Sequence, residues 1–230
     1  MGAILLIRHG QASFGAGDYD QLSATGFTQS RVLGESLKQR VLKVDQVLTG
    51  GMRRHRQTAE TALAAMGVDT KIEDDAGWAE YDHVAVIAAH RPEWADQTRM
   101  MAELNKLPNP RRAFQQEFEQ ATARWIGGLH DDNYPESWRA FCVRVQQALQ
   151  RLHARLGKSQ TALVFTSGGP ISAVAQQLLH LSDANTLRLN WTLANAAISK
   201  LIYSERALYL STLNDHAHFE GARADLITYR

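Results

Sequence analysis

Cysteine is almost absent from this chain: Cys142 is the only one in 230 residues. A single thiol excludes an intrachain disulfide and is typical of a reducing compartment. Long apolar runs are absent as well. The run from Ala3 to Ile7 is too short for a membrane span or a secretion signal, and no basic segment precedes it. We therefore expect a cytoplasmic protein that has no membrane partner.

An excess of charge of either sign is also missing, since 25 basic residues face 24 acidic ones and the net charge is +1. This balance gives no bulk attraction to nucleic acid, so any anion site must come from a local cluster. The apolar share of 44% is ordinary for a globular chain of this length, which can build a sizeable core. The oligomeric state stays open, with a homodimer as one option.

What the chain does have is an alternation of strands and helices. Short apolar runs at 3–7 and 45–49 predict buried strands, and helix-forming segments follow them at 23–41 and 54–66. This order is typical of a three-layer α/β/α fold with a mostly parallel central sheet. The later elements are expected as a helix over 135–156, a strand over 161–165, a helix from Pro170 to Leu181 and an edge hairpin of strands over 198–203 and 207–213.

The stretch from about residue 75 to 133 breaks this alternation. It has no convincing strand, several helix-forming pieces and three prolines, Pro92, Pro108 and Pro110. We predict a helical insertion within a single domain that spans residues 1–230. Such insertions often form a lid or a substrate wall, and an inert structural excursion is the alternative.

The first predicted strand ends directly in Arg8-His9-Gly10-Gln11. Ligands bind at the carboxyl ends of strands in open parallel sheets, so these side chains stand where chemistry is expected. An arginine fork suits phosphate oxygens, and a neutral imidazole can attack phosphorus. A buried histidine bonded to a backbone carbonyl would produce the same pattern and is the competing interpretation.

The second predicted strand leads through Gly50-Gly51 into a helix that begins with basic residues. Arg53, Arg54 and Arg56 all fall in or near its first turn, where positive charge opposes the helix dipole. A sequence that places three arginines there is expected to need them for an anion. A solvated basic surface would account for Arg53 or Arg56 but less well for all three.

These segments resemble the motifs of the histidine phosphatase (phosphoglycerate-mutase-like) superfamily. Arg8-His9-Gly10 is similar to its signature, and Arg54 to Glu60 is similar to its Arg-Ala-x-Gln-Thr-Ala-Glu block. The resemblance covers nearly the whole chain. Its blocks occur in the family's order at 8–10, 22–29, 54–60, 136–141 and 213–218.

The resemblance implies roles for particular residues. His9 would be phosphorylated during turnover, while Arg8 and Arg54 would hold the phosphoryl oxygens. The segment Gly77-Trp78-Ala79-Glu80-Tyr81-Asp82-His83 is similar to the block that supplies the proton donor, which points to Glu80. Because Val84 stands where that block has glycine, Asp82 remains a competitor for this role.

One position departs from the family in a way that bears on catalysis. The family's last catalytic block reads Ser-His-Gly-Gly, whereas this chain has Thr166-Ser167-Gly168-Gly169, so Ser167 replaces the second histidine. A hydroxyl donates one hydrogen bond but brings no charge. The following helix N-terminus could still bind phosphate, and we expect Ser167, Gly168 and Gln11 to contribute contacts. Four other histidines could supply the missing imidazole, and the sequence does not choose among His55, His83, His216 and His218.

The resemblance implies a phosphatase that hydrolyses a small phosphorylated metabolite through a phosphohistidine on His9. No metal or other cofactor is expected, because the arginines supply the positive charge a metal would bring. The expected ligands are the phosphorylated substrate and inorganic phosphate. Two alternatives remain: a phosphoglycerate mutase-like phosphoryl transferase, and a non-catalytic module that binds a phospholigand and has lost turnover.

Overall fold

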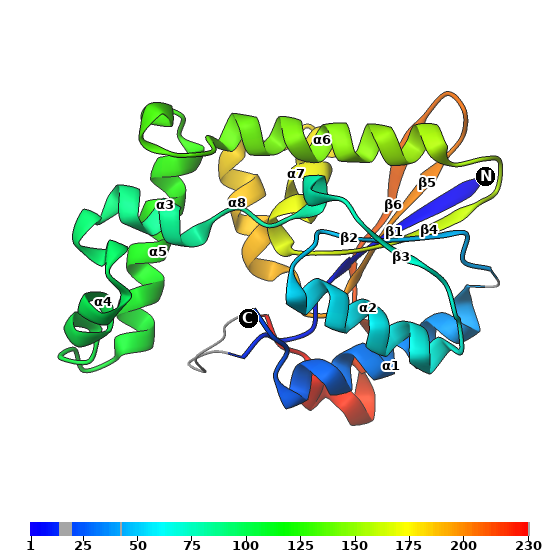
Figure 1. The fold of residues 1–230 in the computed structure, drawn as a ribbon, viewed down its shortest axis with the longest axis horizontal. Coiled ribbons are helices and arrows are strands. Elements are labelled where there is room, and N and C mark those ends of the chain that lie inside the picture. The colour runs from blue at the N-terminus through cyan, green and yellow to red at the C-terminus, as the bar shows by residue number, and fades with distance from the viewer. Residues whose placement is uncertain (14–19, 42, 230) are drawn as a thin grey trace. The chain divides into compact units, whose positions relative to one another are not determined.

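A six-stranded mixed sheet forms the centre of the fold (Figure 1). The computed structural model describes residues 1–13, 20–41 and 43–229. The strands lie in the order β3-β2-β4-β1-β5-β6. Their bounds are β1 Gly2–Arg8, β2 Gln46–Thr49, β3 Ile72–Asp74, β4 Thr161–Thr166, β5 Ile198–Tyr203 and β6 Leu208–Asp215.

Parallel pairing dominates this sheet. β3, β2, β4 and β1 run in one direction, β5 is antiparallel to β1, and β6 is antiparallel to β5. The mostly parallel sheet and the edge hairpin that the sequence predicts are therefore confirmed. Arg8 pairs with Thr166 at the ends of β1 and β4, so the residues after both strands emerge at the same edge of the sheet.

Helices cover both faces of the sheet, which gives the predicted three layers. Figure 1 shows α1 and α2 on one face, with α7 and the C-terminal part of α6 on the other. Leu5 and Ile7 of β1 join a core cluster with Leu33 of α1 and Ala59 of α2. Successive side chains of a strand alternate between its faces, so the equally buried residues in between pack on the opposite side. The bounds are α1 Ala24–Arg40, α2 Arg53–Met66, α6 Trp138–Arg155, α7 Gly168–Leu179 and α8 Asp183–Thr192.

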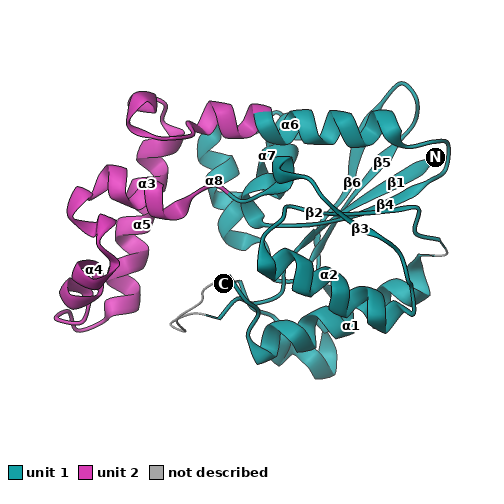
Figure 2. Ribbon diagram, viewed as in Figure 1, with its two compact units in different colours: residues 1–80, 144–230 teal, residues 81–143 magenta. Residues whose placement is uncertain are grey.

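The chain divides into two compact units, Met1–Glu80 with Arg144–Arg230, and Tyr81–Val143 (Figure 2). The second unit contains helices and, among its residues, all of which the structure describes, no strand. One of its apolar clusters centres on Ile87, Trp94 and Leu104. Its α-helices are α3 His83–His90, α4 Gln97–Leu104, α5 Pro110–Ile126 and the first residues of α6.

Some predicted bounds were wrong. α6 begins at Trp138 rather than at residue 135, and α7 begins at Gly168, which makes Pro170 its third residue instead of its first. The strand β3 and the helix α8 were not predicted at all. β3 has three residues, two of them acidic, so it lacks the apolar run by which a strand is recognised.

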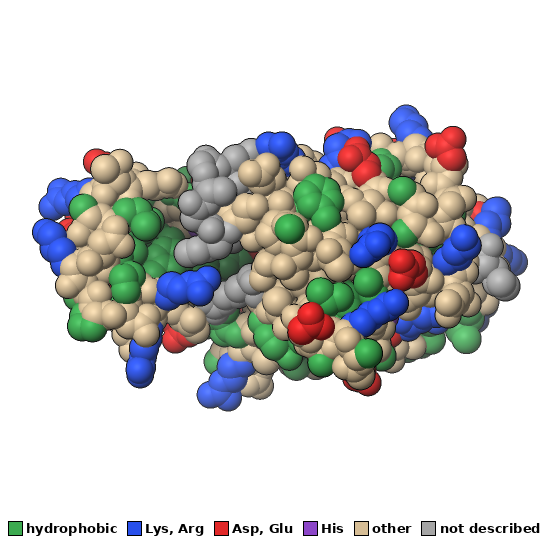
Figure 3. Space-filling view, turned by 90° about the horizontal axis from the view of Figure 1, so that it is seen from below, with side chains coloured by type: hydrophobic (Ala, Val, Ile, Leu, Met, Phe, Trp, Pro, Cys, Tyr) green, Lys and Arg blue, Asp and Glu red, His purple; other side chains and the backbone are tan. Residues whose placement is uncertain are grey.

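The charge balance of the sequence is visible on the surface. On the face in Figure 3, basic and acidic side chains lie interspersed, without an extended area of one sign among the described residues. Within the described chain, the structure also contains no helix long and apolar enough to cross a membrane.

Candidate active site

The candidate site lies where β1, β4 and β2 end. The His9 backbone N–H donates to the carbonyl of Thr166 at 2.8 Å, so the loops after β1 and β4 leave the sheet side by side. β2 pairs with β4 on its other side and leads through a short turn into α2. Three loops thus converge at the carboxyl edge of the parallel strands, the usual place for a ligand in such sheets.

The His9 ring has a defined tautomer. Its Nδ1 lies 2.7 Å from the carbonyl oxygen of Gly10, which can only accept, so the ring proton belongs on Nδ1. Nε2 therefore carries a lone pair, and Arg54 Nε donates to it at 3.2 Å. Burial, followed by the neighbouring guanidinium groups of Arg54 and Arg8, holds the pKa of His9 well below its usual value. The ring is thus a neutral imidazole with a lone pair on Nε2.

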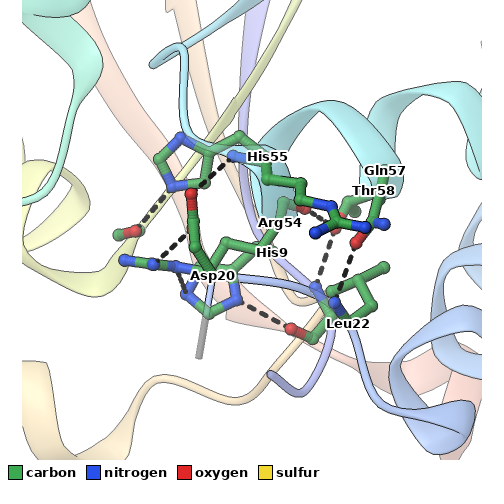
Figure 4. A network of polar contacts seen from close by, with 10 residues as sticks. His9, Asp20, Leu22, Arg54, His55, Gln57 and Thr58 are labelled. Carbon is green, nitrogen blue, oxygen red and sulfur yellow. Dashed lines mark hydrogen bonds and ion pairs between the residues drawn. The ribbon is translucent and has the colours of Figure 1, made fainter. Parts of the chain in front are cut away.

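Arg54 is almost fully buried at the start of α2 and is fixed from several sides (Figure 4). Its Nη1 forms an ion pair with Asp20 Oδ1 at 2.7 Å. Its carbonyl accepts from Thr58 Oγ1 at 2.7 Å, and Thr58 Oγ1 in turn accepts from Gly10 N–H at 3.0 Å. Thr58 therefore ties the first turn of α2 to the loop after β1. The Asp20 contact was not foreseen, because no local pattern links it to the helix.

Arg8 is held by main-chain carbonyls. Its Nη1 donates to Leu193 O and, at 2.8 Å, to Tyr229 O. A Cβ atom added to Gly168 would lie 3.8 Å from Arg8 Nε, so the guanidinium reaches the N-terminus of α7. Arg8, His9, Arg54 and Gly168 are thus brought together, and their role as a phosphate cradle remains a prediction.

The loop before β5 forms hydrogen bonds to the backbone carbonyl of His9. Asn195 Nδ2 donates to the His9 carbonyl at 3.1 Å, and Ala196 N–H donates to it at 3.3 Å. Ala196 has a φ of +54°, a left-handed conformation that costs free energy for a residue with a Cβ. Sequence reasoning missed this support, since the segment contains no motif that marks it.

The two carboxylates that compete for the proton-donor role have different local contacts. Glu80 Oε2 accepts from Gly169 N–H at 3.2 Å, at the N-terminus of α7. Asp82 Oδ1 accepts from Val84 N–H at 2.9 Å and from Ala85 N–H at 3.0 Å, which caps α3. Glu80 therefore contacts the N-terminus of α7, the same helix end at which Ser167 and Gly168 lie.

Gln11 is tied to the start of α1. Its Oε1 accepts from Ser23 Oγ at 2.9 Å, and its backbone N–H donates to Gln29 Oε1 at 2.8 Å. Ser23 in turn caps α1 through Gly26 N–H at 3.1 Å. These contacts fix the loop after His9, and a phosphate contact by Gln11 remains a prediction.

Of the four histidines that could supply the missing imidazole, His55 contacts Ser167. His55 Nε2 lies 2.7 Å from Ser167 Oγ, and neither residue is exposed. The His55 ring centroid is 5.6 Å from that of His9. Burial, and secondarily the charge of Arg54, keeps the pKa of His55 well below its usual value. The sequence offered no way to choose this histidine, since the contact joins residues 112 positions apart.

The remaining histidine candidates have other contacts. His216 Nδ1 lies 2.7 Å from the carbonyl of Asn214, and the ring of His218 packs against Phe219. His83 begins α3 in the second unit. No group of three or more His, Cys, Asp or Glu side chains that could hold a metal ion occurs in the described part of the chain.

The fold and this cluster of arginine and histidine agree with a comparison to protein families. The model of the histidine phosphatase superfamily (branch 1) matches residues 4–216, and the chain belongs to this family. No curated protein sequence matches the chain.

Solved structures of the same fold include enzymes of two kinds. Phosphoglycerate mutase from Bacillus anthracis str. Sterne matches with a TM-score of 0.67 at 16% identity, over 97% of this chain and 96% of that one. A phosphoserine phosphatase mutant from Entamoeba histolytica, in complex with phosphoserine, matches with a TM-score of 0.65 at 16% identity, over 95% and 99%. A mycobacterial glucosyl-3-phosphoglycerate phosphatase in complex with VO3 matches with a TM-score of 0.62 at 20% identity, over 93% and 99%.

Proposed function

We propose that this chain is a phosphatase that hydrolyses a small phosphorylated metabolite through a phosphohistidine on His9. The observation that carries the proposal is the state of the His9 ring. Its proton is committed to the Gly10 carbonyl, and its Nε2 lone pair lies beside the Arg54 guanidinium. A neutral nucleophile next to a fixed cation is what attack on a phosphate monoester requires.

In the first half-reaction His9 Nε2 attacks phosphorus, and the bond from phosphorus to the ester oxygen breaks. Glu80, as a carboxylic acid, gives its proton to the departing oxygen. The phosphorylated ring keeps its Nδ1 proton, and the Gly10 carbonyl stabilises the positive charge that the ring acquires. Arg54 Nε, which donates to Nε2 in the structure, turns to a phosphoryl oxygen as the P–N bond forms.

In the second half-reaction water attacks phosphorus and the P–N bond breaks. The Glu80 carboxylate takes a proton from the water, and inorganic phosphate leaves His9 as a neutral ring. Glu80 is placed for this step because its Oε2 accepts from Gly169 N–H at the N-terminus of α7, where partial positive charge favours the carboxylate form that takes the proton. Asp82 has a competing use, since its Oδ1 caps α3.

The negative charge of the phosphoryl oxygens needs donors that are already in place. Arg8 and Arg54 are proposed as the main ones, and both are held by contacts to other parts of the chain. The N–H groups that begin α7 at Gly168, together with Gln11, are proposed to complete the cradle. In the proposed cycle the guanidinium groups of Arg8 and Arg54 offset the negative charge of the phosphoryl oxygens.

The experiment measures hydrolysis of p-nitrophenyl phosphate by wild type and by His9→Ala. We expect the variant to lose turnover while keeping its fold, because a loop residue at the end of a strand adds little to the core. His153→Ala is the matched control, since that ring contacts the Ser204 carbonyl in the β5–β6 turn. Turnover of the same product by His9→Ala would show that His9 is not the nucleophile.

The same protein separates the alternatives. Transfer of phosphate between positions of phosphoglycerate, faster than release to water, would identify a mutase. Tight binding of inorganic phosphate or orthovanadate by wild type, without turnover of several phosphate esters, would identify a binding module. The proposed function predicts release of inorganic phosphate instead.

A further inference from the structure

We propose that His55 and Ser167 work as a pair, in which His55 positions the Ser167 hydroxyl so that it donates a hydrogen bond to the phosphoryl group on His9. The inference rests on the proposed function. It gives a role to a buried imidazole that the two half-reactions above do not use. His55 is a positioning residue in this scheme, and Ser167 makes the contact with substrate.

The pair is assembled from two elements that enter the site from different strands. Ser167 follows β4, and His55 is the third residue of α2, directly after Arg54. Figure 4 shows the His55 ring in the same network as Arg54 and His9. Both members are fully buried, their polar atoms are 2.7 Å apart, and the ring centroids of His55 and His9 are 5.6 Å apart. A contact this close between fully buried polar groups is a built feature of the site.

The surroundings of His55 favour one tautomer. Its Nδ1 is buried and has no hydrogen-bond partner among the described residues. A buried N–H without an acceptor is rarer and more costly than an acceptor left without a donor. The proton of the neutral ring is therefore better placed on Nε2, from which it is donated to Ser167 Oγ. The hydroxyl hydrogen of Ser167 is then available to another acceptor.

The position of Ser167 directs that hydrogen towards the phosphoryl group. Thr166 accepts from the His9 backbone, so residue 167 leaves β4 beside His9. Ser167 is the N-cap residue of α7, yet its side chain makes no capping bond within the described chain. Its hydroxyl instead contacts His55, at the helix end that begins with Gly168. A neutral hydroxyl held by an imidazole supplies a fixed donor without adding charge.

This pairing changes what a single substitution at Ser167 should do. From the sequence alone, Ser167→His would restore an imidazole and raise turnover. In the structure the space beside residue 167 already holds the ring of His55, so a second ring there requires room that only the removal of His55 provides. The informative variant is therefore the exchange, His55→Ala together with Ser167→His.

The test is a double-mutant cycle on p-nitrophenyl phosphate, with kcat and KM measured separately. We expect His55→Ala and Ser167→Ala each to lower kcat on the order of 100-fold, the usual effect of losing one fixed donor. The double variant should be no worse than either single one, because the two act as a unit. His55→Gln, which keeps a donor, should recover part of kcat, and the exchange variant should approach wild type to within about tenfold. His153→Ala should match wild type, and thermal melting confirms that every variant is folded.

The outcomes separate the two proposals. Turnover that depends on His9 but is equal in wild type, His55→Ala and Ser167→Ala would overturn the pair and leave the phosphatase standing. Additive losses, or a loss in His55→Ala that His55→Gln does not relieve, would also overturn it. If wild type hydrolyses no ester, the phosphatase proposal fails. The affinity for orthovanadate then tests whether His55 and Ser167 act as a pair. Equal vanadate affinity in wild type and both alanine variants would then overturn the pair, and an affinity about tenfold lower in both would support it.

Discussion

The position of one proton links the residues of the site. The Gly10 carbonyl fixes the proton of His9 on Nδ1, and Arg54 lies at the opposite nitrogen. Gly10 follows His9 directly, whereas Arg54 lies 45 positions further along the chain, in the first turn of α2. The sequence could predict Arg8, His9 and Arg54 as a cluster because they follow the ends of two predicted strands, where ligands bind in a parallel sheet. It could not predict the tautomer, which depends on a side-chain rotamer.

Glu80 gives a prediction at the same scale. We expect Glu80→Gln to slow hydrolysis of an alkyl phosphate far more than that of p-nitrophenyl phosphate, because a general acid matters most for a basic leaving group. The measurement is kcat/KM on both esters. Glu60→Gln serves as the control, because Glu60 is an exposed carboxylate of α2 that forms an ion pair with Arg56. Equal slowing of both esters would remove Glu80 from the role and direct attention to Asp82.

At the scale of elements, the turn between β2 and α2 brings Arg54 and His55 into place. A Cβ added to Gly50 would lie 2.4 Å from Trp78 O and 2.7 Å from His55 Nδ1, so only glycine fits there. The backbone of Trp78 cannot give way easily, because its carbonyl accepts from Thr166 Oγ1 at 2.6 Å. The turn thus sets how closely α2 approaches β4.

This close packing makes Gly50→Ala a test of the element. We expect a loss of about 1–3 kcal/mol in the free energy of unfolding, typical of overpacking, together with reduced turnover as His55 is displaced. Denaturant unfolding and the p-nitrophenyl phosphate assay measure the two effects. In Gly157→Ala the nearest atom lies 3.5 Å from the new Cβ, so this variant should resemble wild type. A stable and fully active Gly50→Ala would show that the turn tolerates a side chain.

Elements with a strong pattern were predictable and weakly patterned ones were not. β1 and β4 carry uninterrupted apolar runs because helices cover both of their faces, and their bounds came within a residue or two. α8 begins with a Ser182 cap, but none of its apolar residues is buried, and Thr186 is its one buried residue. A helix without a buried apolar stripe gives only a weak periodic signal in the sequence.

For the molecule as a whole, buried neutral histidines link stability to pH. The pKa values of His9 and His55 lie well below 6.5 and that of His218 is lowered to about 4, mainly because burial disfavours their charged forms. In the unfolded chain these rings would titrate near 6.5. The unfolded state then binds more protons between pH 6.5 and 4, so the free energy of unfolding should fall as the pH drops through this window.

Calorimetry can count these protons. At pH 5.5 we expect unfolding to take up as much as about 0.9 proton for each of these histidines, as measured in buffers of different ionisation enthalpy. His9→Asn should take up about one proton fewer than wild type. Equal uptake by the two proteins would mean that His9 is already protonated in the folded state, which would disagree with its role as a neutral nucleophile.

The most direct test of the central claim is to trap the phosphorylated protein. Wild type is mixed with p-nitrophenyl phosphate, quenched in alkali within the first turnovers, digested and mapped by mass spectrometry. The account predicts a phosphoryl group on His9 that is stable in base, labile in acid and absent from His9→Ala. A phosphoryl group on Ser167, or turnover during which no residue of the protein becomes phosphorylated, would contradict it.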